Sequence, residues 1–185
     1  MGKTKIGAKP VLYPLPAVLV GTKVEDKPNF MTVAWCGIVG NGPPRISMVL
    51  GRRHYTCKGI EESKSFSINI ASAGMAKEVD FCGLYSGGSV DKAEMFTVFY
   101  GSLESAPLIE ECPVNMECRV IEMTDNGGSY FIVGEVIEVH VDDACMTEGK
   151  PDAQKIDPLI FATISRKYYR LGDYIGDAYS IGKKE

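Results

Sequence analysis

Two arginines and a threonine, Arg52, Arg53 and Thr56, stand where a β-rich run gives way to a predicted helix, in the segment RRHYTCKGIEES. Guanidinium groups bind phosphate oxygens through charge-assisted hydrogen bonds, and the free N–H groups at a helix start favour an anion. We expect Thr56 to be the N-cap of this helix. Lys92 adds a candidate point charge from the glycine-rich segment LYSGGSVDKAEMF. These residues indicate a phosphate site, with solvated surface arginines and an ordinary surface lysine as the alternative.

Several other kinds of chemistry lack the residues they need. His54 and His140 are the only histidines, and His140 lies inside a β-rich run, so a hydrolytic Cys-His or Ser-His pair is not indicated. The chain has no GxGxxG turn between a strand and a helix, no GxxxxGK[ST] phosphate loop and no GxSxG nucleophile. No short-spaced ligand pair predicts a metal site. We therefore expect any activity to come from a bound cofactor.

The composition excludes further classes of protein. A net charge of −4 gives no general attraction to nucleic acid, which needs clustered Lys and Arg. No apolar run reaches the roughly 18 to 20 residues of a membrane span. Prolines stand where a signal peptide would have its apolar run, and the six cysteines contain no CxxC pair. We expect free thiols, no membrane contact and a cytoplasmic location.

The elements that must position these residues are mostly predicted strands. The runs PAVLVGT (16–22), FMTVAWCGIVG (30–40) and RISMVLG (45–51) predict an antiparallel meander. Two matching runs, 114–124 and 129–141, flank the turn DNGG and predict a long hairpin. Ser72 is a candidate cap for a second helix in which Met75, Val79 and Cys82 share a face and which stops at Gly83.

These elements predict a mainly β fold in one domain, 1–185. About seven strands with short helical insertions favour a closed antiparallel barrel, because a parallel sheet would need regular βαβ alternation. The run YFIVGEVIEVHV is partly apolar on both faces. We therefore expect helices or a second subunit to cover the outer face of the barrel, and a dimer would supply such a cover.

Four segments in a fixed order carry a resemblance to a known family: NFMTVAW, PPRISMVLGRRHYT, SGGSVDKAEMF and LIFATISRKYYRLGDYIGDAY. Through them nearly the whole chain resembles the flavin-reductase-like domain family, and especially its flavoredoxin-type, FMN-binding members. The resemblance implies a split β-barrel homodimer with FMN at the barrel's edge near the subunit interface. It also implies electron or hydride transfer through the flavin.

The needs of FMN can be assigned to different segments. We expect Arg52, Arg53, Thr56 and Lys92 at the phosphate, with one of the two arginines facing it. Contact with the ring is expected from the edge of one strand, where backbone N–H groups of MTVAW could stabilise the negative charge that develops on reduction. The candidates there are Asn29, Met31, Thr32, Val33, Ala34 and Trp35. Trp35 packs either near the flavin or in the core, and no side chain is predicted to be catalytic because the flavin carries the chemistry.

Three functions remain open at this point. The first is an FMN-dependent oxidoreductase or electron carrier between NAD(P)H or a redox partner and an acceptor. The second is an NAD(P)H:flavin reductase that releases reduced flavin to a monooxygenase, and the third is a non-catalytic ligand-binding barrel. Cys36 and Cys82 are expected to be small core residues, with a place near the flavin as the alternative. Candidates for the substrate side, for the partner subunit or simply for packing are Tyr130, Phe131, Tyr168, Tyr169 and Arg170.

Overall fold

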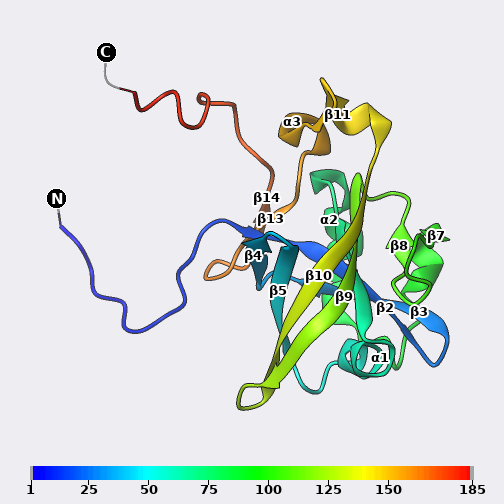
Figure 1. The fold of residues 1–185 in the computed structure, drawn as a ribbon. Helices are drawn as coiled ribbons and strands as arrows, with labels where there is room; N and C mark the ends of the chain where they lie inside the picture. The colour runs from blue at the N-terminus through cyan, green and yellow to red at the C-terminus, as the bar shows by residue number, and fades with distance from the viewer. Residues whose placement is uncertain (1, 184–185) are drawn as a thin grey trace.

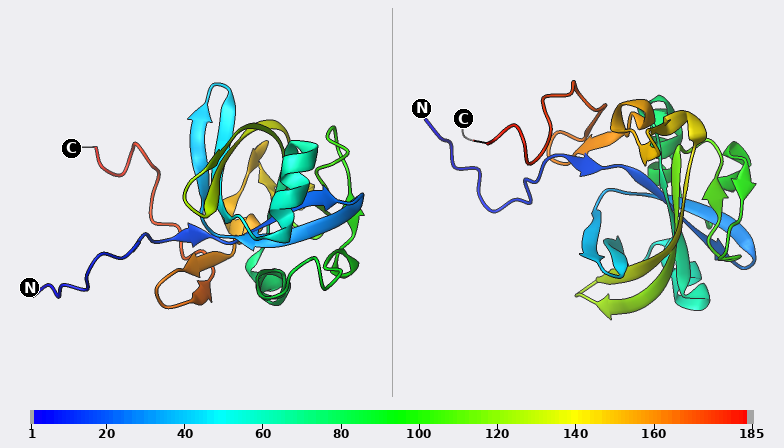
Figure 2. Two further views of the ribbon diagram at one scale, coloured as in Figure 1. Left: turned by 90° about the horizontal axis from the view of Figure 1, so that it is seen from below. Right: turned by 45° about the horizontal axis from the view of Figure 1, so that its top comes forward.

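Seven antiparallel strands form the main sheet of the structure, a computed structural model that describes residues 2–183 (Figure 1). The sheet curls into a barrel around its own apolar face (Figure 2). The fold is therefore mainly β, as the sequence predicts, and the long hairpin lies where the sequence places it. In sheet order the strands are β3 (Lys27–Val33), β2 (Val18–Val24), β6 (Ser65–Ile70), β9 (Val114–Asp125), β10 (Ser129–Val141), β5 (Pro44–Gly51) and β4 (Cys36–Asn41).

The barrel is split between its two edge strands. Only Ala34 and Trp35 separate β3 from β4 in the chain, yet the two strands occupy opposite edges of the sheet. The predicted continuous strand over 30–40, and with it the simple three-run meander, is therefore wrong. The chain leaves β3 at Val33 and crosses to the far edge, where β4 pairs with β5. An edge strand keeps one row of backbone N–H and C=O groups free of the sheet, so β3 offers such a row at the split.

Alternating apolar side chains fill the barrel. In β5, Ile46, Met48 and Leu50 point inward and are buried, as their period-two spacing predicts. β2 is buried on both faces, because a second apolar cluster around Leu19 and Phe30 covers its outer side. The barrel interior also holds Val18, Val20, Phe66, Ile68, Cys118 and Ile132.

Two helices cover parts of the barrel. α1 (Tyr55–Ser63) packs against β2 and buries Cys57 and Ile60, while α2 (Ala76–Leu84) packs on β3 and buries Val79 and Cys82. The expected helix start at Ser72 is wrong. The chain first makes a 3-10 turn over Ala73–Met75, and the Ser72 hydroxyl makes no capping hydrogen bond.

The remaining elements are short. β7 (Val98–Phe99) pairs with β8 (Leu108–Ile109), β11 (Met146–Thr147) pairs with β12 (Lys150–Pro151), and α3 (Ala153–Ile156) follows them. β1 (Leu15–Pro16), β13 (Ile160–Ala162) and β14 (Lys167–Tyr169) form a three-stranded sheet, and 3-10 turns occupy Ala93–Met95 and Asp143–Cys145. No helix within residues 2–183 is long and apolar enough to cross a membrane.

Candidate functional site

A cavity of about 220 Å³ lies where the start of α1, the end of α2 and the edge strand β3 meet. Four of the predicted site residues share this cavity, although the sequence separates them by more than sixty positions. Its wall consists of Met31, Arg53, His54, Tyr55, Thr56, Cys82, Gly83, Leu84, Tyr85, Ser86, Gly87 and Lys92. We call it the phosphate cavity, after the group that the sequence predicts here. A second cavity of about 310 Å³ adjoins it and shares Tyr55, Gly87 and Lys92.

Lys92 is the most unusual residue of the phosphate cavity. Its side chain is buried, with only 3% of its surface exposed, and its Nζ donates to the carbonyls of Cys82 and Tyr85 at 3.0 and 2.9 Å. Burial lowers the pKa of this ammonium group. Within the described residues no carboxylate forms an ion pair with it. The expected alternative of an ordinary surface lysine is therefore wrong, and no carboxylate within the described chain neutralises this buried cation.

The start of α1 adds hydrogen-bond donors to the same cavity. The N-cap is His54 and not Thr56, which lies inside the first turn, so the expected N-cap is wrong. His54 makes no side-chain cap, and no acidic residue occupies the first turn. The first N–H groups of a helix have no partner within it, so this end remains free for an anion. Burial, and then the charge of Lys92, lowers the pKa of His54.

Thr56 instead joins α1 to β3 through Asn29. Its hydroxyl oxygen accepts a hydrogen bond of 2.9 Å from the amide nitrogen of Asn29 on β3, and both side chains are buried. A side chain at Gly87 would collide with the Asn29 amide, so the glycine-rich segment can approach β3 only through a residue without a Cβ. Asn29 therefore positions the loop and the helix, and its polar atoms also border the second cavity.

Residues 31–35, which the sequence proposes for contact with the ring, have different surroundings in the structure. Met31 lines the phosphate cavity, and the Thr32 hydroxyl donates to the carbonyl of Val79, which holds α2 on β3. Val33 is buried in the barrel core. Ala34 is half-buried, and Trp35 is 54% exposed at the split, so the alternative of a core tryptophan is wrong.

The two arginines face different surroundings. Arg52 donates to the carboxylate of Asp125 at 2.7 Å and lies over the ring of Tyr130, so its guanidinium is engaged by the long hairpin. Arg53 is exposed and lines the phosphate cavity. Arg53 is thus the arginine that the geometry makes available to an anion.

The other candidates are placed by ordinary contacts. The Tyr130 hydroxyl donates to Glu61, the Tyr168 hydroxyl donates to Asp80, and Arg170 pairs with Asp157. Phe131 and Tyr169 are half-buried and exposed, respectively. All six cysteines are free thiols, and burial raises the pKa of Cys36 and of Cys82 to about 11, although Cys82 lines the phosphate cavity. Residues 2–183 contain no cluster of side chains suited to a metal ion.

Only four of the twelve wall residues of the phosphate cavity were among the predicted site residues, and the eight others include His54, Tyr55, Tyr85 and Ser86. His54 and Tyr55 lie between the predicted residues Arg53 and Thr56. A turn that surrounds an anion is continuous in the chain, so the sequence could have indicated both as wall residues. Tyr85 and Ser86 open the glycine-rich segment, but their role depends on how that segment folds back over the end of α2.

Fold and site together define a class: a split β-barrel with a cavity lined by cationic groups and free N–H donors beside its open edge. The chain matches the flavin reductase like domain family over residues 11–172 and belongs to that family. A protein of Archaeoglobus fulgidus is 34% identical over 143 residues, which are 76% of this chain and 80% of that protein.

Two solved structures are similar to this chain over almost its whole length. The flavoredoxin of Methanosarcina acetivorans is 42% identical, covers 99% of this chain and 98% of its own, and superposes with a TM-score of 0.95. The flavoredoxin of Desulfovibrio vulgaris (Miyazaki F) is 37% identical, covers 98% of this chain and 100% of its own, and has a TM-score of 0.93. An FMN-binding protein from Thermus thermophilus shares the fold at 22% identity, covering 96% of this chain and 99% of its own, with a TM-score of 0.81.

Proposed function

We propose that this protein binds FMN and acts as an electron-transfer flavoprotein of the flavoredoxin type, between NAD(P)H or a redox partner and an acceptor. The observation that carries the proposal is the buried ammonium of Lys92, which has no carboxylate partner within residues 2–183, in the same cavity as the uncapped start of α1. A phosphate monoester would supply a negative charge beside Lys92, an acceptor for the N–H that its two carbonyl hydrogen bonds leave over, and acceptors for the free N–H groups of α1. The residues present therefore fit the phosphate end of FMN.

The split edge of the barrel suits the ring end. β3 is an edge strand, so alternate backbone groups near Met31 and Val33 are free of the sheet and can donate to a polar ring edge. Donors fixed in this way stabilise negative charge without reorganising. Trp35 supplies an exposed aromatic surface beside them. Bound FMN would supply electron and hydride transfer, which the side chains of this chain do not provide themselves.

The proposal includes a homodimer and a cytoplasmic location. Apolar side chains at the split and on the chain ends are exposed in a single copy, which supports a second copy as their cover. Six free thiols and no disulfide among the described residues are typical of a reducing compartment.

Anaerobic titration with NADH and NADPH, followed by gel filtration, tests the redox proposal. The protein is first loaded with FMN, and flavin that co-elutes with it is measured before and after reduction. Reduction with flavin retained on the protein supports the electron carrier. Loss of flavin on reduction replaces it with the flavin reductase, and failure to bind FMN contradicts both and leaves a ligand-binding barrel without this cofactor.

A further inference from the structure

Both ends of the chain extend away from the barrel. Residues 2–14, the N-terminal arm, and residues 173–183, the C-terminal arm, leave on the same side of the molecule, the side of β13 and β14 (Figures 1 and 2). The hydrogen bonds of the C-terminal arm are local, such as Ile181 N–H to the Asp177 carbonyl at 3.0 Å and the Tyr174 hydroxyl to Asp177 at 2.8 Å. Within the described residues, no hydrogen bond or ion pair joins this arm to its own barrel.

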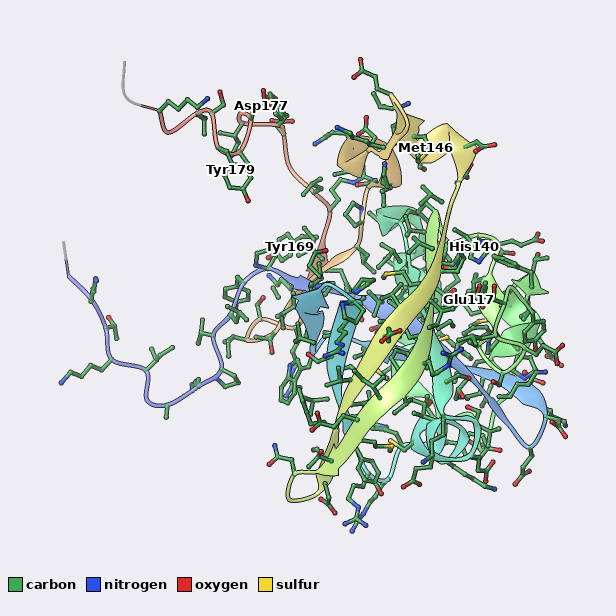
Figure 3. The ribbon with its side chains drawn as sticks, in the orientation of Figure 1. Glu117, His140, Met146, Tyr169, Asp177 and Tyr179 are labelled. Atoms are coloured by element: carbon green, nitrogen blue, oxygen red, sulfur yellow. The ribbon has the colours of Figure 1, made fainter. Side chains whose placement is uncertain are left out.

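The C-terminal arm nevertheless carries large apolar side chains. Ile175 is 88% exposed and Tyr179 is 98% exposed, and Figure 3 shows Tyr179 well away from the barrel. Tyr174 and Ile181 are exposed as well. Burying such side chains stabilises each by roughly 1.5 to 3 kcal/mol, so an arm of this composition gains strongly from a surface that covers it.

The barrel offers a receiving surface. β4 is a free edge strand, and it presents Ile38 and Val39 to solvent beside Trp35. An apolar pocket of about 510 Å³ opens at the base of the arms, between Tyr13, Phe161, Tyr169 and their neighbours. Exposed apolar surfaces of this kind mark interaction sites.

Two observations indicate that the occupant is a second copy of this chain. First, one copy carries both the protruding arm and the apolar receiving surface, and a two-fold symmetric interface needs both on the same molecule. Second, the Methanosarcina acetivorans flavoredoxin superposes with a TM-score of 0.95 over 99% of this chain, which the barrel alone could not reach. The path of the arms is therefore shared, and a path without support inside one chain requires support from a neighbouring chain. The C-terminal arm also lies beyond the family domain, which ends at residue 172.

We propose that two copies exchange their C-terminal arms, so that residues 173–183 of one copy lie on β4 and the apolar pocket of the other. The apolar side chains of the arm are then buried, and the arm covers the free edge of β4 and the apolar pocket of the partner. This inference rests on the homodimer proposed above and is independent of what the phosphate cavity binds.

The first test weakens the arm within the full chain. Molar mass is measured by light scattering over a dilution series for the wild-type protein and for the double variant Ile175→Ser, Tyr179→Ser. We expect a wild-type dimer and a dissociation constant at least tenfold higher in the variant. Ile121→Ser is the matched control, because Ile121 is an exposed apolar residue on β9, away from the arms, and should leave the dimer unchanged. A variant that dissociates like the wild type overturns the arm exchange but leaves the homodimer, and a monomeric wild type overturns both.

The second test locates the arm directly. A photo-crosslinking amino acid replaces Ile175, and the protein is mixed with an isotope-labelled wild-type copy before irradiation. We expect cross-links from position 175 to peptides around 36–41 or 160–169 of the labelled copy. Cross-links confined to the copy that carries the probe would show that the arm folds back on its own barrel and would overturn the exchange. Flavin content is recorded in both tests, so a failure of FMN binding is seen separately.

Discussion

Lys92 is the residue on which the candidate site depends most. From the sequence it is one lysine in a loop rich in Gly and Ser, and nothing in that local pattern distinguishes it from a surface lysine. Its burial arises because the loop folds over the end of α2, where Lys92 satisfies two carbonyls that the helix leaves unpaired. Tertiary structure, and not local spacing, therefore decides its role.

Replacing Lys92 by Ala is expected to weaken FMN binding. Loss of one charge-assisted contact to phosphate costs roughly 1 to 3 kcal/mol, or about 5- to 150-fold in Kd. Quenching of flavin fluorescence on binding measures the change. Lys58→Ala is the control, because Lys58 is an exposed lysine of α1 that pairs with Glu25. Equal Kd values for both variants and the wild type would contradict the place given to the phosphate.

His54 should make the folding stability of the flavin-free protein depend on pH. Burial and Lys92 hold the pKa of His54 below its usual 6.5, so the folded protein binds fewer protons than the unfolded chain as pH falls through 6.5. Stability must then decrease as pH decreases in that range. We expect His54→Asn to remove part of this decrease in urea unfolding experiments between roughly pH 7 and 5. An unchanged slope in the variant would show that the imidazole does not titrate in this way.

At the scale of elements, a buried carboxylate fastens the segment between β7 and β8 to the barrel. Glu117 on β9 is fully buried and accepts hydrogen bonds from the backbone N–H groups of Ser102 and Leu103, at 3.1 and 2.5 Å. His140 on β10 places its Nε2 2.8 Å from the same carboxylate. Figure 3 labels both residues. Burial alone would raise the pKa of Glu117, but these three hydrogen bonds outweigh it and the pKa is lowered.

Glu117→Gln is expected to destabilise the fold by about 1 to 3 kcal/mol, because two backbone donors lose a charged acceptor. The lowered pKa adds stability that is present above pH 4.5, the ordinary pKa of Glu, and is lost as pH falls through the folded-state value. Between neutral and acid pH, the unfolding temperature of the variant should therefore decrease less than that of the wild type. Glu122→Gln, at an exposed position of the same strand, is the control. Equal unfolding temperatures for the two variants would contradict the role of Glu117.

The contact between α1 and β2 depends on Gly59. A Cβ at this position would collide with the carbonyl of Lys23 and approach the Thr22 and Val24 side chains within 2.9 Å. Gly→Ala inside a helix usually stabilises by roughly 0.5 to 1 kcal/mol, and here we expect the opposite sign. Gly83→Ala in α2 meets its nearest atom at an ordinary 3.4 Å and should not destabilise. Calorimetry measures the unfolding temperatures of both variants. A higher unfolding temperature for Gly59→Ala than for the wild type would refute the close approach of α1 to β2.

The elements themselves were largely predictable. Period-two spacing identified β5, and matching lengths around DNGG identified the hairpin of β9 and β10, because local pattern determines such strands. The family resemblance implied a split barrel, but the local pattern did not predict where the split falls, because 30–40 reads as one β-rich run and only the closed shape of the sheet separates Val33 from Cys36. The N-caps of α1 and α2, His54 and Met75, were also missed, because the polar residues Thr56 and Ser72 fit a helix start by sequence and tertiary contacts place the starts elsewhere.

At the scale of the whole molecule, one barrel brings together residues that the sequence keeps far apart. The split places the free edge of β3, the start of α1 and the glycine-rich loop at one side, where the family resemblance expected the cofactor. The same curvature leaves β4 as an open edge beside the chain termini. The single domain over 1–185, the donor and the acceptor stay predictions.

The visible absorption spectrum of the purified protein, followed by acid release and chromatography of the chromophore, tests the central claim most directly. The account predicts the two absorption bands of an oxidised flavin and release of FMN, in near-equal amount to the protein after loading. A colourless protein that binds no added FMN would contradict the proposed function while leaving the split barrel and its family intact.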